Sequence, residues 1–174
     1  MIQIRAGVFE TNSSSMHSLV MMKDGGYCST IPDYLLDKDG VWDIYREGDL
    51  VFGCCPFQCL CTFEEKVRYA IASLCSYRKD AEKKFREIEA IVNEIRPECT
   101  GIKLPYNRWS DETSYGHVDE DKLTGFLKKY NISLKEFFTD KKYVVIVDGD
   151  EYCIFDNLKA SGLVNFDKIE EEYC

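Results

Sequence analysis

The feature that most constrains the fold is a run of aliphatic residues that ends at a tight-turn signal. Residues 143–147 read Tyr-Val-Val-Ile-Val, and Asp148-Gly149-Asp150 follows them directly. Asp-Gly is a preferred pair for a type I′ turn, whose twist matches that of the strands on either side. The segment KKYVVIV, the turn and the segment EYCIFD therefore predict a β-hairpin in the last third of the chain.

Helix signals precede this hairpin. Thr62 with Glu65, and Ser133 with Glu136, have the spacing of capping boxes, in which the hydroxyl and the carboxylate each accept from a backbone N–H. Pro97 ends a second helix, because proline cannot continue one. Apolar residues spaced by three and four predict helices over about 63–78, 81–96, 120–130 and 134–139.

Strand patterns lie mostly in the first third of the chain. Alternating apolar and polar residues predict strands over 2–9 and 16–22, and one or two short strands within 41–53. Residues 98–118 are interpreted as irregular. The pattern predicts one α+β domain over residues 1–174, an antiparallel or mixed sheet with about four helices packed mainly on one face.

The charge of the chain restricts its partners. It carries 22 basic and 31 acidic residues, a formal net charge of −9. An acidic surface repels phosphate backbones, so we expect no direct binding of nucleic acid, whereas a protein with a basic surface is a suitable partner. No apolar run has the length of a membrane span, and MIQIRAGVFE lacks the apolar core of a secretory signal. We therefore expect a cytoplasmic protein without membrane contact.

A polar segment with catalysis-capable side chains follows the first predicted strand. It consists of Glu10, Thr11, Asn12, Ser13, Ser14 and Ser15, and His17 lies two residues beyond it. Such a segment can be a structural turn, because these side chains satisfy nearby backbone groups. It can also bind an anion through its N–H and hydroxyl groups, or supply a serine nucleophile activated by a histidine.

The second histidine lies in an acidic setting. His117 precedes Asp119 by two residues, so the carboxylate could orient the imidazole or share a metal with it. The two histidines do not fit the His-x-Ser/Thr pattern of two-histidine phosphoesterases. Either can equally be a hydrogen-bonded structural residue.

Neither a metal nor a cofactor is expected. Nine cysteines, an odd number, include four between Cys54 and Cys61. Structural zinc sites use two well-separated Cys pairs, so this crowding favours reduced cysteines that pack as small apolar residues. A metal cluster or redox chemistry stays a lesser alternative. The serine-rich segment lacks the glycine spacing of a phosphate-binding loop.

Acidic clusters are the candidate protein-binding residues. They are Asp119, Glu120 and Asp121, and Glu170, Glu171 and Glu172, together with Thr11 and Asn12 of the serine-rich segment. Residues 170–174 are interpreted as a frayed, solvated tail. Clusters of carboxylates can bind a basic groove on a partner.

Residues 9–18 resemble the opening of a family of small, largely uncharacterised proteins from gut Firmicutes and their phages and mobile elements. The family motif, Phe-Glu-Thr-Asn-Ser-Ser-Ser-x-His-Ser, is matched from Phe9 to Ser18. Leu50–Gly53 is similar to a Gly-Glu-Phe-Gly-Trp element, and residues 143–151 to an aliphatic strand with an Asp-rich turn. Where the family has Ile-Asp-His, this chain has Gly-His-Val-Asp at 116–119.

Two functional hypotheses follow. The resemblance implies a protein of mobile elements, a class that includes anti-CRISPR proteins, so the first hypothesis is an inhibitor of a host nucleic-acid-handling protein such as a Cas effector. The second is a small enzyme for a nucleotide or phosphate-bearing substrate. Its site would join Glu10, Ser13–Ser15 and His17 on one side with His117 and Asp119 on the other.

Overall fold

The architecture is known from a computed structural model. It describes residues 16–22, 30–44, 58–76, 79–104, 118, 120–148, 157, 159–160 and 166–173. In these ranges, strands and helices follow one another in an α+β order, and the predicted fold class is confirmed. The helices are α1 (Phe63–Cys75), α2 (Ala81–Ile95), α3 (Glu120–Tyr130) and α4 (Leu134–Thr139), with a 3-10 turn at Asp33–Leu35.

The main sheet is antiparallel and has the strand order β3-β5-β1-β6. Its strands are β1 (Met16–Met22), β3 (Gln58–Leu60), β5 (Tyr143–Asp148) and β6 (Phe166–Tyr173). Strand β1, which the sequence predicted, lies between β5 and β6. Two short strands, β2 (Val41–Asp43) and β4 (Gly101–Lys103), form a separate parallel pair.

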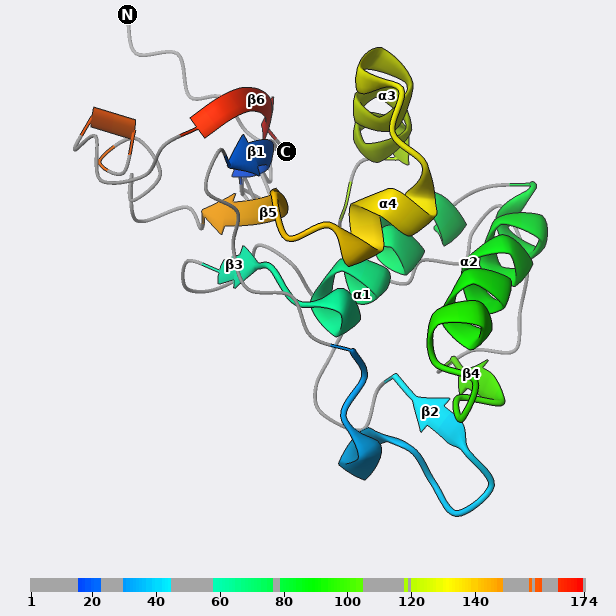
Figure 1. Cartoon of the computed structure of the whole chain (residues 1–174). Helices are drawn as coiled ribbons and strands as arrows, with labels where there is room; N and C mark the ends of the chain where they lie inside the picture. The colour runs from blue at the N-terminus through cyan, green and yellow to red at the C-terminus, as the bar shows by residue number, and fades with distance from the viewer. Residues whose placement is uncertain are drawn as a thin grey trace, which may run out of the picture.

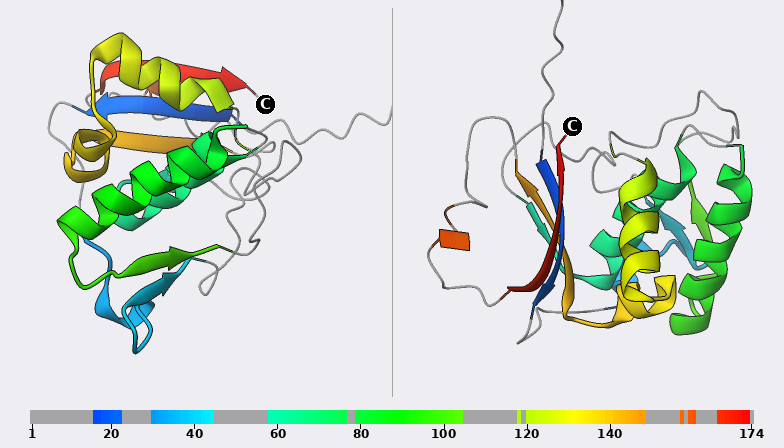
Figure 2. Two further views of the ribbon diagram at one scale, coloured as in Figure 1. Left: turned by 90° about the vertical axis from the view of Figure 1, so that its right-hand side faces the viewer. Right: turned by 90° about the horizontal axis from the view of Figure 1, so that it is seen from above.

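The helices lie mainly on one face of the main sheet, as predicted (Figure 1). Helices α1, α3 and α4 lie next to this face, and α2 packs against α1 farther from the sheet (Figure 2). Leu19, Val145 and Val147 of the sheet belong to the core that these helices share. The alternate residues Val20, Val144 and Ile146 form a second buried cluster on the opposite face.

Helix α1 begins at the capping box that the sequence predicted. The Thr62 hydroxyl accepts from the Glu65 N–H at 3.2 Å, and the Glu65 carboxylate accepts from the Thr62 N–H at 2.9 Å. At α4, the Ser133 hydroxyl accepts from the Glu136 N–H at 3.1 Å. The Glu136 carboxylate accepts a hydrogen bond from the Tyr143 hydroxyl, and this bond joins α4 to the first residue of β5.

Two segments differ from their interpretation in the sequence. Residues 98–118 were expected to be irregular, but β4 lies within them and pairs with β2. Residues 170–173 belong to β6 and pair with β1, so the prediction of a frayed tail is wrong. Backbone hydrogen bonding to β1 outweighs the weak strand propensity of glutamate in this segment.

Strand pairing also differs from the simplest sequential arrangement. The first half of the predicted hairpin is confirmed as β5, and the second half, residues 151–156, lies outside the described residues. The two neighbours of β5 are β1 and β3. Residues 2–9 were expected beside β1, but they also lie outside the described part, and β6 occupies that edge of β1.

Candidate functional site

Most residues of the hypothetical catalytic site lie outside the described part of the chain. This applies to Glu10 through Ser15, including Thr11 and Asn12, and to His117 and Asp119. The structure therefore does not test whether the serine-rich segment meets the second histidine. His17 alone among these residues is placed, as the second residue of β1.

His17 has an acidic neighbour on the adjacent strand β6. In the antiparallel register, His17 is paired with Glu172 of β6 and with Val147 of β5. Residues directly opposite one another on antiparallel strands share a face of the sheet. Since residues alternate along a strand, positions 17 and 172 share the face of Leu19 and Val147, which is the face next to the helices.

The acidic residues of β6 form a line along an edge of the described sheet. Glu170, Glu171 and Glu172 pair with Leu19, Ser18 and His17. Successive strand residues alternate between faces, so three consecutive glutamates give acidic positions on both sides of this edge. Acidic residues also keep an edge strand from pairing with further strands.

A second acidic cluster lies at the same end of the molecule. Glu120 and Asp121 are the first two residues of α3. Both views of Figure 2 place the start of α3 and the C-terminal end of β6 at one end of the molecule. The fold thus places two clusters that are about fifty residues apart in the sequence at the same end of the molecule, which the sequence pattern alone did not indicate. We call Glu120, Asp121 and Glu170–Glu172 the acidic end.

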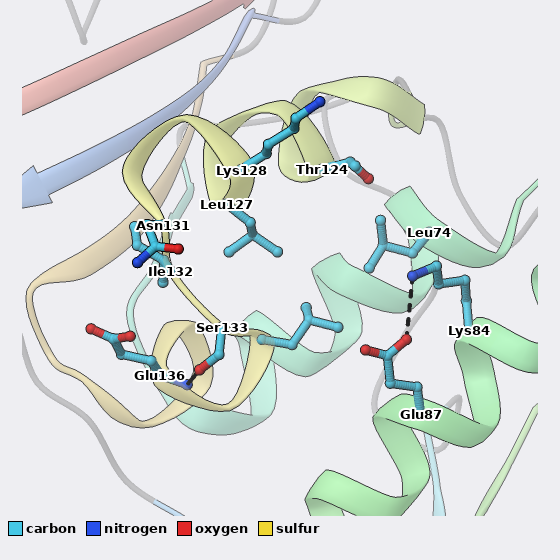
Figure 3. Close-up of a pocket in the computed structure, with 11 residues that line it drawn as sticks. Leu74, Lys84, Glu87, Thr124, Leu127, Lys128, Asn131, Ile132, Ser133 and Glu136 are labelled. Atoms are coloured by element: carbon cyan, nitrogen blue, oxygen red, sulfur yellow. Dashed lines mark hydrogen bonds and ion pairs between the residues drawn. The ribbon is translucent and has the colours of Figure 1, made fainter.

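The described residues also enclose a groove between the four helices (Figure 3). Its volume is about 590 Å³, within the range of small-molecule sites. Its apolar lining comes from α1, α3, the connection between α3 and α4, and the start of α4, namely Leu74, Leu127, Ile132 and Leu134. No sequence pattern indicated this groove, because each helix contributes only a few residues to it.

Polar groups surround the apolar part of the groove. The Lys84 ammonium lies 3.2 Å from the Glu87 carboxylate on α2, and Lys128 and Glu136 line the other side. Figure 3 shows Lys84 and Glu87 on one side of Leu127 and Glu136 on the other. Two lysines and two glutamates give the rim no net charge, so the groove has no evident preference for an ionic ligand.

The shape of the groove depends on the end of α3. Asn131 has a φ of 54°, and the Ile132 N–H bonds back to the Leu127 carbonyl at 2.9 Å. With the Asn131 N–H bonding to the Lys128 carbonyl at 3.3 Å, this is a Schellman motif. Asparagine is one of the few residues that tolerate a left-handed backbone conformation. The asparagine at position 131 was therefore the sequence signal for the end of α3.

The cysteines in the described ranges are not joined in disulfides. Cys75 and Cys99 are buried and pack as small apolar residues, which agrees with their interpretation, whereas Cys59 is exposed and Cys61 is intermediate. Cys54 and Cys55 lie outside these ranges. Where side chains are described, no group of three or more His, Cys, Asp or Glu residues is arranged to hold a metal ion.

Comparisons with known proteins find no family model, curated protein or solved structure that matches this chain. Within the described helices, none has the length and apolar character needed to cross a bilayer.

Proposed function

We propose that this protein is an acidic accessory protein that inhibits a nucleic-acid-handling host protein by covering its basic surface. The acidic end carries this proposal, because it gathers five acidic positions from α3 and β6 at one end of the molecule. The net charge of −9 adds a long-range attraction to any basic partner.

The physical basis is competition with nucleic acid. Proteins that hold DNA or RNA line their binding channels with lysine and arginine, which attract phosphate groups. A strand with three consecutive glutamate positions offers the same sign of charge on a protein scaffold. The likeness of residues 9–18 to proteins of mobile elements makes a Cas effector nuclease the first target to test.

The test measures inhibition of guide-dependent DNA binding by a purified Cas effector. One variant reverses the charges of β6 (Glu170→Lys, Glu171→Lys, Glu172→Lys), and a second reverses Glu120 and Asp121. Wild type should inhibit less as salt is raised, and both variants should inhibit less than wild type at low salt.

A matched control reverses three acidic residues elsewhere. Glu94 and Glu98 have side chains 62% and 67% exposed, and Glu82 is an exposed residue of α2. The control variant Glu82→Lys, Glu94→Lys, Glu98→Lys should keep most of the inhibition. Equal loss in all variants would show that only net charge matters, and inhibition that survives reversal of the acidic end would contradict the proposal.

The register of β1 and β6 favours a second candidate, a small hydrolase for phosphate-bearing substrates. A carboxylate opposite a histidine is a common way to orient a general base, and His17 is paired with Glu172. Under this proposal Ser13–Ser15 supply the nucleophile or bind the phosphate. His17→Ala should then abolish hydrolysis of nucleotide substrates while the melting temperature stays within a few degrees. If His17→Ala instead lowered the melting temperature strongly together with the activity, His17 would be a structural residue.

A further inference from the structure

The apolar floor of the groove between the helices is fixed by the main core. Leu74, Ile132 and Leu134 are buried members of that core, and Leu127 packs against it while staying partly exposed. In Figure 3 the side chains of Leu74 and Leu127 project from α1 and α3 into the same space. Since the fold itself holds these positions, a ligand meets a largely formed groove and binding requires little reordering of the protein.

Three of the charged groups that line the groove already have partners within the protein. The Lys84 ammonium pairs with the Glu87 carboxylate at 3.2 Å, and the Glu136 carboxylate accepts from the Tyr143 hydroxyl at 3.1 Å. The fourth is Lys128, an exposed residue, and an exposed charge attracts an ion only weakly. An ionised ligand would therefore gain little from this rim.

Neutral polar side chains complete the lining. The Ser133 hydroxyl accepts from the Glu136 N–H at 3.1 Å, and a hydroxyl that accepts one hydrogen bond can also donate one. Thr124 and Asn131 add a second hydroxyl and an amide, and both are exposed residues. An apolar floor with a few neutral hydrogen-bonding groups at its margin is the usual composition of a small-molecule site.

We propose that this groove binds an uncharged small molecule that combines an apolar ring system with one hydroxyl group. The ring lies on the floor against Leu74 and Leu127, and the hydroxyl bonds to Ser133 or Asn131 at the margin. The volume of about 590 Å³ is sufficient for such a molecule. A charged ligand of the same shape is disfavoured, because it loses hydration on entering an apolar groove. Binding is non-covalent and does not involve the acidic end.

The test titrates the ¹⁵N-labelled full-length protein with three indole derivatives of nearly the same shape. Tryptophol is neutral, indole-3-acetate is an anion and tryptamine is a cation. Salt at about 1 M screens the long-range effect of the net charge of −9. Tryptophol should shift the amide signals of residues 124–136 and of Leu74 and Lys84 most strongly. Each ion should bind about tenfold more weakly than tryptophol.

Two variants alter the groove, and a third is the matched control. Leu127→Asn removes apolar floor, and Thr124→Phe fills the groove from an exposed position on α3. Each should weaken tryptophol binding about tenfold, since a partly exposed leucine loses its apolar contact or the space is occupied. The control is Ile91→Asn on α2, which changes another partly buried residue at the margin of the core. Its affinity should equal that of wild type.

Circular dichroism should show that all three variants are folded. The comparison of the three ligands on wild type does not depend on any variant. Failure of tryptophol to shift signals at millimolar concentration, or shifts centred outside the groove, would overturn the proposal. An ion that binds as tightly as tryptophol would do the same. So would unchanged affinity in both groove variants, or an equal loss in Ile91→Asn.

Discussion

The ammonium group of Lys66 donates a hydrogen bond to the backbone carbonyl of Asp140, with 3.0 Å between Nζ and the oxygen. Lys66 is fully buried on α1, and Asp140 is the residue that ends α4. The last carbonyls of a helix have no partner within it, and a positive charge there is favourable. The bond therefore joins the central helix to the end of α4, just before the chain enters β5.

Replacing Lys66 should destabilise the fold to a degree set by the volume that is lost. Lys66→Ala leaves a cavity, and the Asp140 carbonyl keeps only its hydrogen bond from the Tyr143 N–H, so we expect a loss of about 3 kcal/mol in the free energy of unfolding. Lys66→Met keeps most of the volume and removes a buried charge, so its loss should be about 2 kcal/mol smaller. Urea unfolding measures both, and equal losses would show that volume is not the main factor.

Removing the Thr62 hydroxyl should weaken the start of α1. Thr62→Ala should lower the free energy of unfolding by about 1 kcal/mol, because the Glu65 N–H loses its acceptor. Thr62→Ser is the control, since it keeps a hydroxyl in place. Chemical denaturation compares the two, and a serine variant as unstable as the alanine variant would argue against the cap.

Two glycines should respond to alanine in opposite directions. Gly40 has a φ of 78°, and a Cβ there would lie 2.5 Å from the Glu98 carbonyl oxygen. Gly40→Ala should therefore cost about 2–4 kcal/mol. Gly125 lies in α3 with no atom within 4 Å of such a Cβ, so Gly125→Ala should stabilise by about 0.5–1 kcal/mol. Thermal unfolding of the two variants tests the signs, and a shift in the same direction would contradict this account.

Acid should remove a contribution of Asp140 to stability. Burial by itself raises the pKa of Asp140, but hydrogen bonds from Lys142 and the charges of Lys142 and Lys66 outweigh it, so the pKa lies below 3.8. A carboxyl with a lowered pKa stabilises the fold above the unfolded pKa, and this contribution disappears as pH falls through the folded pKa.

The variant Asp140→Asn isolates this contribution. At neutral pH it should be less stable than wild type, and the difference should shrink as the pH is lowered below about 4. Urea unfolding at a series of pH values gives the comparison. A difference that stays constant into the acid range would mean that the charge of Asp140 does not matter.

Local signals explain why the helices were predictable. Capping at Thr62 and Ser133, and apolar residues at spacings of three and four, depend only on neighbouring residues, and helices α1 to α4 lie where they were expected. Strand partners depend on segments far apart in the sequence. The pairing of β1 with β6, and of β2 with β4, therefore had no signal that could be read locally.

The acidic end and the groove were missed for the same reason. Glu170–Glu172 look like a solvated tail when only composition is considered, and the pairing with β1 that makes them a strand is a tertiary interaction. The groove needs side chains from four helices, whose mutual packing the sequence does not give. Positions in the serine-rich segment lie outside the described residues, so their role stays a prediction.

The place of β1 between β5 and β6 has a consequence for folding during synthesis. Residues 16–22 are translated long before both of their sheet partners, 143–148 and 166–173. The four helices can form first, because their contacts are local, but the main sheet closes only when β6 has been translated. Until then the edge of β1 that pairs with β6 stays open, and chains that stall before residue 166 should be the ones that chaperones hold and proteases remove.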